Sequence, residues 1–334
     1  MNNRIEWIDM AKGYGVILVI LGHFGLEKLG YWIYSFHMPL FFFLAGYVFK
    51  EKLKIKDFVL KRIKKLIIPY IFLGLGVILF NLLIMLYANT FDLTEISRQL
   101  KSLLFQVRYS NLWFLTCLFS LNFIFFILLN LGLSYTIVSI LVLIMTFGGV
   151  IYYKFNGNPI FWNIDVCFTT SIFFWLGYLY RKDIEFFKNI KEKINQYFSI
   201  KLLFLMSIFF NWLMYLYSQE GLEMFDSRYG NPIFIYFIAI IGILLILKLS
   251  KKKTINWIKF IGENTLIYFA WHQNIAMVLI KKFLEILNFP FERISINIGV
   301  LCLYYIINLI LILLILTFFT KILLKTKLKF LIGK

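Results

Sequence analysis

LIIPYIFLGLGVILFNLLIMLY, residues 66–87, carries no charged side chain from its first position to its last. About 20 mostly apolar residues are enough for an α-helix to cross the roughly 30 Å of hydrocarbon in a bilayer. This run therefore predicts a membrane-spanning helix. Runs of similar length and character recur along the whole chain, so the same interpretation extends well beyond this stretch.

Ten apolar runs reach or approach spanning length, and they predict an all-α, polytopic membrane helix bundle with about ten transmembrane helices. The predicted spans are 10–27, 32–49, 66–87, 111–131, 134–153, 165–180, 199–218, 232–248, 262–280 and 295–320. The first and sixth runs are short for full crossings. No connecting segment is long enough for a soluble catalytic domain. Residues 1–334 are therefore predicted to form a single integral membrane domain, with any chemistry within the membrane or at its edge.

The overall composition agrees with this class. Of the 334 residues, 61% are apolar and 16% are charged, whereas soluble domains have about 45–50% apolar and about 25% charged residues. In a soluble protein the net charge of +18 would suggest nucleic-acid binding. Here the cations lie between apolar runs, where they set the topology and meet anionic lipid. We therefore predict the lipid bilayer, and no nucleic acid, as a partner.

The distribution of basic residues predicts the orientation. If the N-terminus is cytoplasmic, 26 of the 35 Lys and Arg residues fall on the cytoplasmic side. Such an excess follows the positive-inside rule. We predict cytoplasmic N- and C-termini and a multi-pass location in the cell (inner) membrane.

All three histidines, His23, His37 and His272, lie inside predicted spans. At helical rise, His23 and His37 fall at similar depths on consecutive antiparallel helices, so one shared layer of imidazoles is possible. Each could simply hydrogen-bond a neighbouring helix. A three-histidine metal site is disfavoured, because no pair has the i, i+4 spacing, and no metal is expected. General acid/base catalysis is the favoured role, since imidazole titrates near neutral pH.

Several short motifs occur in a recognisable order. They are Ile8-Asp9-Met10-Ala11-Lys12-Gly13 followed by Leu21-Gly22-His23, Ser35-Phe36-His37-Met38-Pro39-Leu40-Phe41-Phe42-Phe43-Leu44-Ala45-Gly46-Tyr47, Lys61-Arg62-Ile63-Lys64-Lys65-Leu66-Ile67-Ile68-Pro69-Tyr70, Leu112-Trp113-Phe114-Leu115, Phe174-Trp175-Leu176-Gly177-Tyr178-Leu179-Tyr180-Arg181, and Gly262-Glu263-Asn264-Thr265-Leu266-Ile267-Tyr268-Phe269-Ala270-Trp271-His272. Together they resemble the acyltransferase-3 family, in the branch of fucose O-acetylase-like proteins. The family's R-x10-H motif has Lys12 here in place of arginine, so the cation is kept but the bidentate fork is lost.

The resemblance implies an O-acyltransferase, most simply an O-acetyltransferase. It would move an acyl group from cytosolic acyl-CoA, such as acetyl-CoA, to a hydroxyl of a cell-surface polysaccharide or its lipid-linked precursor. The phosphates of coenzyme A need cations on the cytosolic face. The candidates are Lys12, Lys61, Arg62, Lys64, Lys65 and Arg181, of which Arg62 and Arg181 align with family arginines. Plain positive-inside charge is the alternative for each lysine.

His23 is the candidate general base, and His37, Lys12, Asp9 and His272 complete the predicted catalytic set. Asp9 lies about 21 Å below His23 along a helix, too far to orient the imidazole, and is expected to pair with Lys12 at i, i+3.

Substrate-binding roles are predicted for Trp113, Glu263, Asn264 and Tyr268. Trp113 could stack on a sugar or on adenine, or anchor a helix at the interface. Glu263 could instead cap a helix. Tyr268 and His272 share a helix face.

A transporter or flippase for polysaccharide or lipid-linked glycan is the alternative function. Such a protein would be expected to show paired repeats and broken helices near the midplane. The sequence contains no internal repeat that we detect, and the polar residues near the middle of the predicted spans include the three histidines but no carboxylate. These features favour the enzyme.

Overall fold

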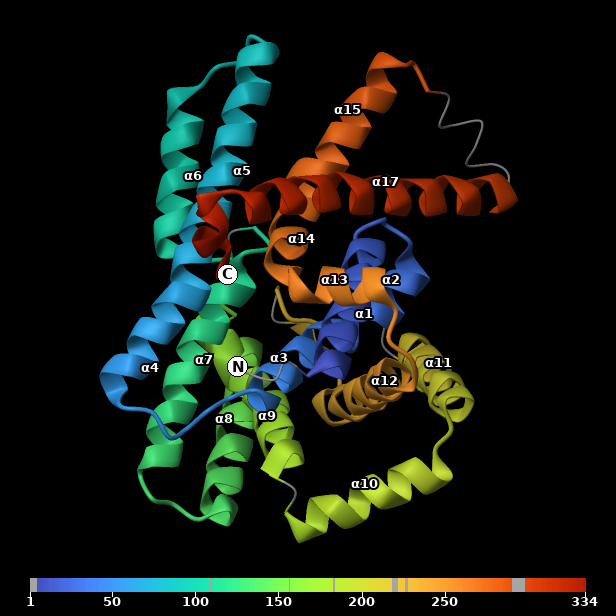
Figure 1. The fold of residues 1–334 in the computed structure, drawn as a ribbon. Coiled ribbons are helices and arrows are strands. Elements are labelled where there is room, and N and C mark those ends of the chain that lie inside the picture. The colour runs from blue at the N-terminus through green and yellow to red at the C-terminus, as the bar shows by residue number, and fades with distance from the viewer. Residues whose placement is uncertain are drawn as a thin grey trace. The chain divides into compact units, whose positions relative to one another are not determined.

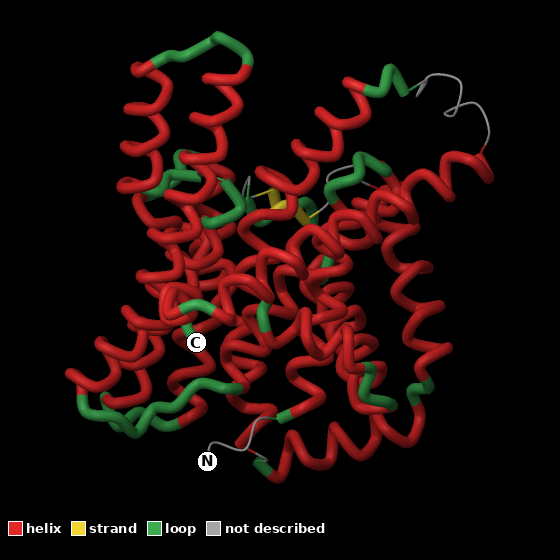
Figure 2. Tube along the Cα trace, turned by 45° about the horizontal axis from the view of Figure 1, so that its top comes forward, coloured by secondary structure: helices red, strands yellow, loops and turns green. Residues whose placement is uncertain are grey.

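The computed structural model describes residues 5–108, 110–155, 157–182, 184–217, 222–225, 228–289 and 298–334. This part of the chain is almost entirely helical (Figure 1, Figure 2). Its only strands, β1 (Leu222–Glu223) and β2 (Arg228–Tyr229), pair as a small antiparallel hairpin, yellow in Figure 2. The predicted all-α class is confirmed at this level.

The chain separates into two compact units. Unit 1 comprises Met1–Leu60, Gln106–Arg108 and Trp113–Glu263, and unit 2 comprises Lys61–Phe105, Tyr109–Leu112 and Asn264–Lys334. The expectation that residues 1–334 act as one domain stays a prediction.

Unit 1 contains the N-terminal helices and most of the middle of the chain. Its elements are α1 (Glu6–Gly22), α2 (Glu27–Tyr34), α3 (His37–Tyr47), α7 (Trp113–Asn130), α8 (Tyr135–Phe155), η2 (Phe161–Asn163), α9 (Ile164–Lys182), α10 (Glu185–Tyr197), α11 (Ile200–Tyr217), the β1–β2 hairpin, α12 (Pro232–Lys252) and α13 (Asn256–Glu263). Helix α4 (Ile55–Arg62) begins in this unit and ends in unit 2.

Unit 2 contains the end of the chain and one helical pair from its first third. Its elements are η1 (Ile63–Ile67), α5 (Ile68–Tyr87), α6 (Leu93–Phe105), α14 (Thr265–Trp271), η3 (His272–Met277), α15 (Val278–Ile286), α17 (Ile298–Lys325) and η4 (Lys327–Ile332). Elements η1 and η3 are π-helical turns inserted between α-helices.

Six helices in the described residues are long and apolar enough to cross a membrane. They are Ile55–Tyr87, Trp113–Asn130, Tyr135–Phe155, Ile200–Tyr217, Pro232–Lys252 and Ile298–Lys325. They correspond to the predicted spans 66–87, 111–131, 134–153, 199–218, 232–248 and 295–320. The protein is therefore multi-pass, whereas the count of about ten and the cytoplasmic termini stay predictions.

Two of the other predicted spans are not continuous helices, which corrects the prediction. The run 32–49 divides between α2 and α3, and α3 begins two residues before Pro39. Proline is tolerated in the first turn of a helix but not in its interior, so the helix begins close to it. The run 262–280 divides among α13, α14, η3 and α15. Runs 10–27 and 165–180 correspond to the shorter or more polar helices α1 and α9.

Helix α17 shows how the long helices divide their surfaces. Asn308, Ile312, Leu316 and Thr320 are buried and recur every four residues. A second stripe, Ile306, Ile310, Leu314 and Phe318, is between 51% and 62% exposed. Residues four apart share a helix face, so one face packs on unit 2 and the other is an apolar surface suited to lipid.

Helices α3 and α9 cross in close contact in unit 1. A Cβ added at Gly46 would overlap the carbonyl oxygen of Phe174, and one added at Gly177 would overlap that of Phe43. Each glycine therefore faces the backbone of the other helix. Small residues at such crossings let backbones approach, which is how membrane helices gain van der Waals energy. This crossing fixes the position of α3, the helix that begins with His37.

Replacing Gly177 by alanine should destabilise the protein. The new Cβ must displace the α3 backbone, and overpacking of this kind costs about 1–3 kcal/mol. Gly148→Ala on α8 is the matched control, because a Cβ there meets nothing within 4 Å. We expect a lower melting temperature in detergent for Gly177→Ala only. Equal melting temperatures for the two variants would contradict the tight crossing.

Candidate functional site

His23 caps the C-terminal end of α1, where its half-buried side chain meets Tyr34 of α2. The Tyr34 hydroxyl lies 3.4 Å from His23 Nδ1 and donates to the Gly22 carbonyl oxygen at 3.2 Å. The two rings are edge to face, with centroids 6.0 Å apart. A phenol that donates to Gly22 can accept from Nδ1–H. The neutral imidazole then carries its lone pair on Nε2.

His37, the first residue of α3, is buried and lies on another side of the same tyrosine. Its Nδ1 is 3.0 Å from the carbonyl oxygen of Ile33, so Nδ1 carries the proton and donates. The His37 and Tyr34 ring centroids are 5.1 Å apart. Unit 1 thus brings the first two predicted histidines together around Tyr34, which the sequence did not single out.

His272 belongs to unit 2 and is fully buried. Its Nδ1 lies 3.0 Å from the Tyr268 carbonyl oxygen and 2.9 Å from that of Phe269, at the junction of α14 and η3. The Tyr268 hydroxyl lies 2.7 Å from Thr317 Oγ1 on α17. Tyr268 and His272 are therefore neighbours, as their spacing predicts. A single layer of all three imidazoles stays a prediction.

Asp9 and Lys12 form the i, i+3 pair that the sequence predicts. Lys12 Nζ is 3.9 Å from Asp9 Oδ1, with Asp9 buried and Lys12 partly exposed. A Cβ at Gly262 would overlap the Asp9 carbonyl, so α13 packs closely on α1 beside this pair. Glu263 ends α13 and Asn264 precedes α14. Glu263 thus lies between two helices rather than at the start of one continuous span, and both its substrate role and its capping role stay predictions.

Arg181, predicted to bind the donor, is engaged with the end of α3. Its guanidinium donates to the carbonyl oxygens of Phe49 at 2.6 Å and Tyr47 at 3.4 Å. Cations at a helix C-terminus satisfy its last carbonyls and its dipole. These contacts give Arg181 a structural task, and its role toward a donor stays a prediction.

Glu51, in the loop after α3, also contacts α9 near Arg181. Lys182 Nζ lies 2.5 Å from Glu51 Oε1, and the Tyr178 hydroxyl donates to the same carboxylate. Burial alone would raise the pKa of Glu51, but hydrogen bonds from Lys182 and Tyr178 outweigh it, so the pKa lies below its ordinary value. The charged carboxylate holds the loop after α3 against α9.

The other predicted donor cations lie in unit 2, at the junction of α4 and η1. Lys61 and Arg62 end α4, and Lys64 and Lys65 lie on the π-helical turn, where both are exposed. Irregular π-turns inside helices are frequent at functional sites.

Trp113, predicted to stack on a substrate, is buried in unit 1. Its ring lies near those of Phe42 at 6.5 Å, Phe114 at 6.3 Å and Phe225 at 6.4 Å. The contacts present are thus packing contacts, and a substrate role stays a prediction.

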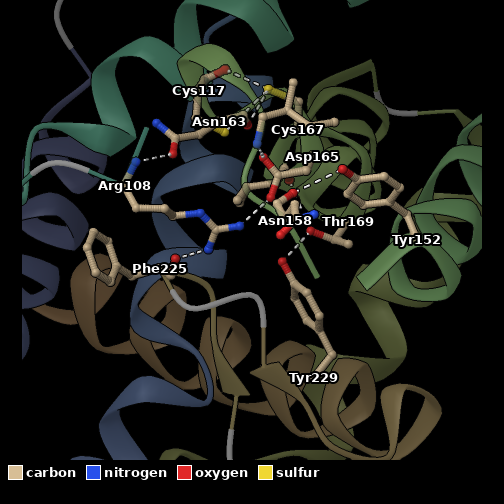
Figure 3. A network of polar contacts seen from close by, with 12 residues as sticks. Arg108, Cys117, Tyr152, Asn158, Asn163, Asp165, Cys167, Thr169, Phe225 and Tyr229 are labelled. Atoms are coloured by element: carbon tan, nitrogen blue, oxygen red, sulfur yellow. Dashed lines mark hydrogen bonds and ion pairs between the residues drawn. The ribbon is translucent and has the colours of Figure 1, made fainter. Parts of the chain in front are cut away.

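A polar network that the sequence did not predict links three distant segments of unit 1 (Figure 3). Arg108 forms an ion pair with Asp165 and donates to the carbonyl oxygen of Phe225, in the turn of the hairpin. Only 12% of the Arg108 side chain and 5% of the Asp165 side chain are exposed. The network therefore joins segment 106–108 and the start of α9 to the hairpin.

Asn163 adds a second set of bonds in the same network. Its Nδ2 donates to the Gln106 carbonyl at 3.2 Å and to Thr116 Oγ1 at 3.3 Å, while the Arg108 amide donates to its Oδ1 at 3.3 Å. Gln106, Arg108, Trp162 and Asn163 all have positive φ, between 43° and 55°. Left-handed backbone is uncommon outside glycine and is retained where surrounding contacts impose it. The bonds of the network hold Gln106, Arg108 and Asn163 in this conformation.

No group of three His, Cys, Asp or Glu side chains within the described ranges could hold a metal ion.

Asp165→Asn should destabilise the protein strongly. Arg108 would keep its charge in a largely buried position, and removing one partner of a buried pair costs about 3–5 kcal/mol. Glu95→Gln is the control, because Glu95 pairs with an Arg98 that is 67% exposed, and exposed pairs contribute about 0–1 kcal/mol. Thermal unfolding in detergent measures both. Similar melting temperatures would show that the Arg108–Asp165 pair contributes little.

Comparison with known proteins identifies the chain. The family model described as an acyltransferase domain, of the acyltransferase-3 type, matches residues 5–317. No curated protein matches the chain, and neither does any solved structure. The matched region covers nearly all of both units and all the motifs quoted above. The chain therefore belongs to the acyltransferase-3 family and is a multi-pass membrane acyltransferase.

Proposed function

We propose that the protein is an O-acyltransferase, most simply an O-acetyltransferase, with acyl-CoA as donor and His23 as general base. The acceptor is a hydroxyl of a cell-surface polysaccharide or its lipid-linked precursor, at the cell membrane. The observation that carries the proposal is the cluster of His23, Tyr34 and His37 in unit 1. Within a family of acyltransferases, a pair of adjacent imidazoles is the group best suited to proton transfer near neutral pH.

The reaction needs a base because an alcohol is a weak nucleophile. His23 Nε2 takes the proton from the acceptor hydroxyl as its oxygen attacks the thioester carbonyl carbon. The C–O bond forms, the tetrahedral intermediate collapses, and the C–S bond breaks. The imidazolium returns the proton to the leaving thiolate, which gives the ester and free coenzyme A. This reaction requires the histidine tautomer in which Nδ1 carries the proton and Nε2 is free to accept one.

His37 supports this step rather than sharing it. Its Nδ1 is committed to the Ile33 carbonyl, which fixes the ring beside Tyr34. Asp9 and Lys12 act as a pair near the start of α1. In this proposal Lys12 attracts the anionic donor, and Asp9 keeps the lysine charged and in place. His272 contributes a buried imidazole in unit 2.

The donor is recognised by its phosphates. Lys61, Arg62 and Lys65, with Lys64 beside them, supply the cations at the junction of α4 and η1. Guanidinium groups bind phosphate through two parallel N–H donors, so Arg62 is assigned the larger share. Trp113, Glu263, Asn264 and Tyr268 are assigned to the acceptor on the family resemblance.

His23→Ala should abolish acyl transfer while donor binding is retained. The purified protein is tested in detergent for acetyl-CoA binding and for slow thioester hydrolysis without acceptor. We expect a loss of about 10²–10⁴-fold in hydrolysis, the usual contribution of a general base. A variant that hydrolyses the thioester at the wild-type rate would remove His23 from the mechanism.

Arg62→Ala should weaken acetyl-CoA binding instead. A charged hydrogen bond contributes about 1.5–3 kcal/mol, which corresponds to a roughly 10- to 150-fold higher Kd. Lys54→Ala removes an exposed lysine from the segment just before α4 and is the charge-matched control. Isothermal titration with acetyl-CoA measures the Kd of each variant. If both substitutions raised the Kd equally, Arg62 would contribute only its positive charge and would not bind the donor specifically.

A further inference from the structure

We infer that Tyr34 is the positioning residue for His23, with its phenol oxygen accepting from Nδ1–H and so holding Nε2 toward the acceptor hydroxyl. This inference rests on the proposed role of His23. In many enzymes a carboxylate orients a catalytic imidazole in this way. Here the task falls to a neutral hydroxyl on the next helix.

The contacts around His23 favour a phenol over a carboxylate. Tyr34 oxygen is 3.4 Å from His23 Nδ1. Asp9 lies on the same helix 14 residues earlier, about 21 Å away at helical rise, and pairs with Lys12. Two carboxylates of nearby elements are engaged elsewhere. Glu27 accepts from the Tyr215 hydroxyl at 3.1 Å, and Glu223 lies 3.8 Å from Arg228.

The Tyr34 ring sits against two glycines. A Cβ at Gly22 would lie 3.6 Å from Tyr34 Cζ, and one at Gly30 would lie 3.6 Å from Tyr34 Cε2. These are ordinary van der Waals distances, so the ring lies beside both glycines without overlapping the space that a methyl group would take. The His37 ring lies 5.1 Å away, centroid to centroid. The ring is thus held by α1, by its own helix and by α3.

The helix that carries Tyr34 is itself fixed. Trp32 Nε1 donates to Ser207 Oγ on α11 at 3.2 Å, and Ser35 Oγ donates to the Trp32 carbonyl at 2.7 Å. The Tyr34 hydroxyl also donates to the Gly22 carbonyl, which fixes the direction of its own proton. Its lone pair then faces Nδ1. With its own proton directed to the Gly22 carbonyl, the phenol oxygen acts as an acceptor toward His23, which favours the tautomer that carries its proton on Nδ1.

A double-mutant cycle in His23 and Tyr34 tests the inference. The rates of donor hydrolysis and acyl transfer are measured for wild type, Tyr34→Phe, His23→Ala and the double variant. Tyr34→Phe keeps the ring and removes only the hydroxyl. We expect kcat to fall about tenfold, the size of one neutral hydrogen bond, with the KM for acetyl-CoA unchanged. In the His23→Ala background, the same substitution should have no further effect, because residues that act as a unit are not additive.

Tyr31→Phe is the matched control. Tyr31 lies on the same helix, but its ring packs on Tyr215 with centroids 5.4 Å apart. It should retain the wild-type rate. An unchanged kcat in Tyr34→Phe, or a loss of the same size with and without His23, would overturn the inference while leaving the proposed base intact. If His23→Ala retains full activity, His23 is not the general base, and the positioning role of Tyr34 is contradicted as well.

Discussion

The close approach of α3 and α9 at Gly46 and Gly177 is the constraint on which the arrangement of unit 1 depends. Membrane helices gain little from hydrophobic burial, because lipid is as apolar as their side chains, so backbone proximity and packing must supply the association energy. Glycine on both helices makes that proximity possible here. Arg181 then ties the carbonyls of Tyr47 and Phe49 to α9. With its C-terminal half fixed in this way, α3 presents His37 at its other end to α2.

The three histidines inside this apolar chain form hydrogen bonds with backbone carbonyls or a hydroxyl. His37 and His272 both donate to main-chain oxygens one turn earlier, and His23 meets a phenol. An isolated carboxylate in such surroundings would be costly to keep charged. Where a carboxylate is buried, as at Asp165, it has a guanidinium and a main-chain amide as partners. The cluster of His23, Tyr34 and His37 is therefore built from side chains that hydrogen-bond to a phenol and to main-chain oxygens rather than to a carboxylate.

The sequence predicted the long helices well, because a run such as 66–87 has only one stable form in lipid. The runs 32–49 and 262–280 were predicted as single spans, whereas the structure divides the first near Pro39, a residue that favours a bend, and the second by packing around the π-turn that begins at His272. Arg181 was assigned to phosphate because a sequence cannot show that two carbonyls 132 and 134 residues away lie beside it. Tyr34 was overlooked for a related reason. One tyrosine among 20 looks like any interfacial tyrosine until its partner is seen.

These placements separate two kinds of family motif that look alike in the sequence. The glycine of the FFFLAG block and the glycine and arginine of the FWLGYLYR block have structural tasks in unit 1, namely close packing and a helix cap. His23 and His37 lie where two helix ends and a phenol meet, and packing alone does not require an imidazole at either position. Loss of activity on substitution of Gly46, Gly177 or Arg181 would therefore not identify a catalytic group. Only a change that leaves the fold and donor binding intact, as expected for His23, does so.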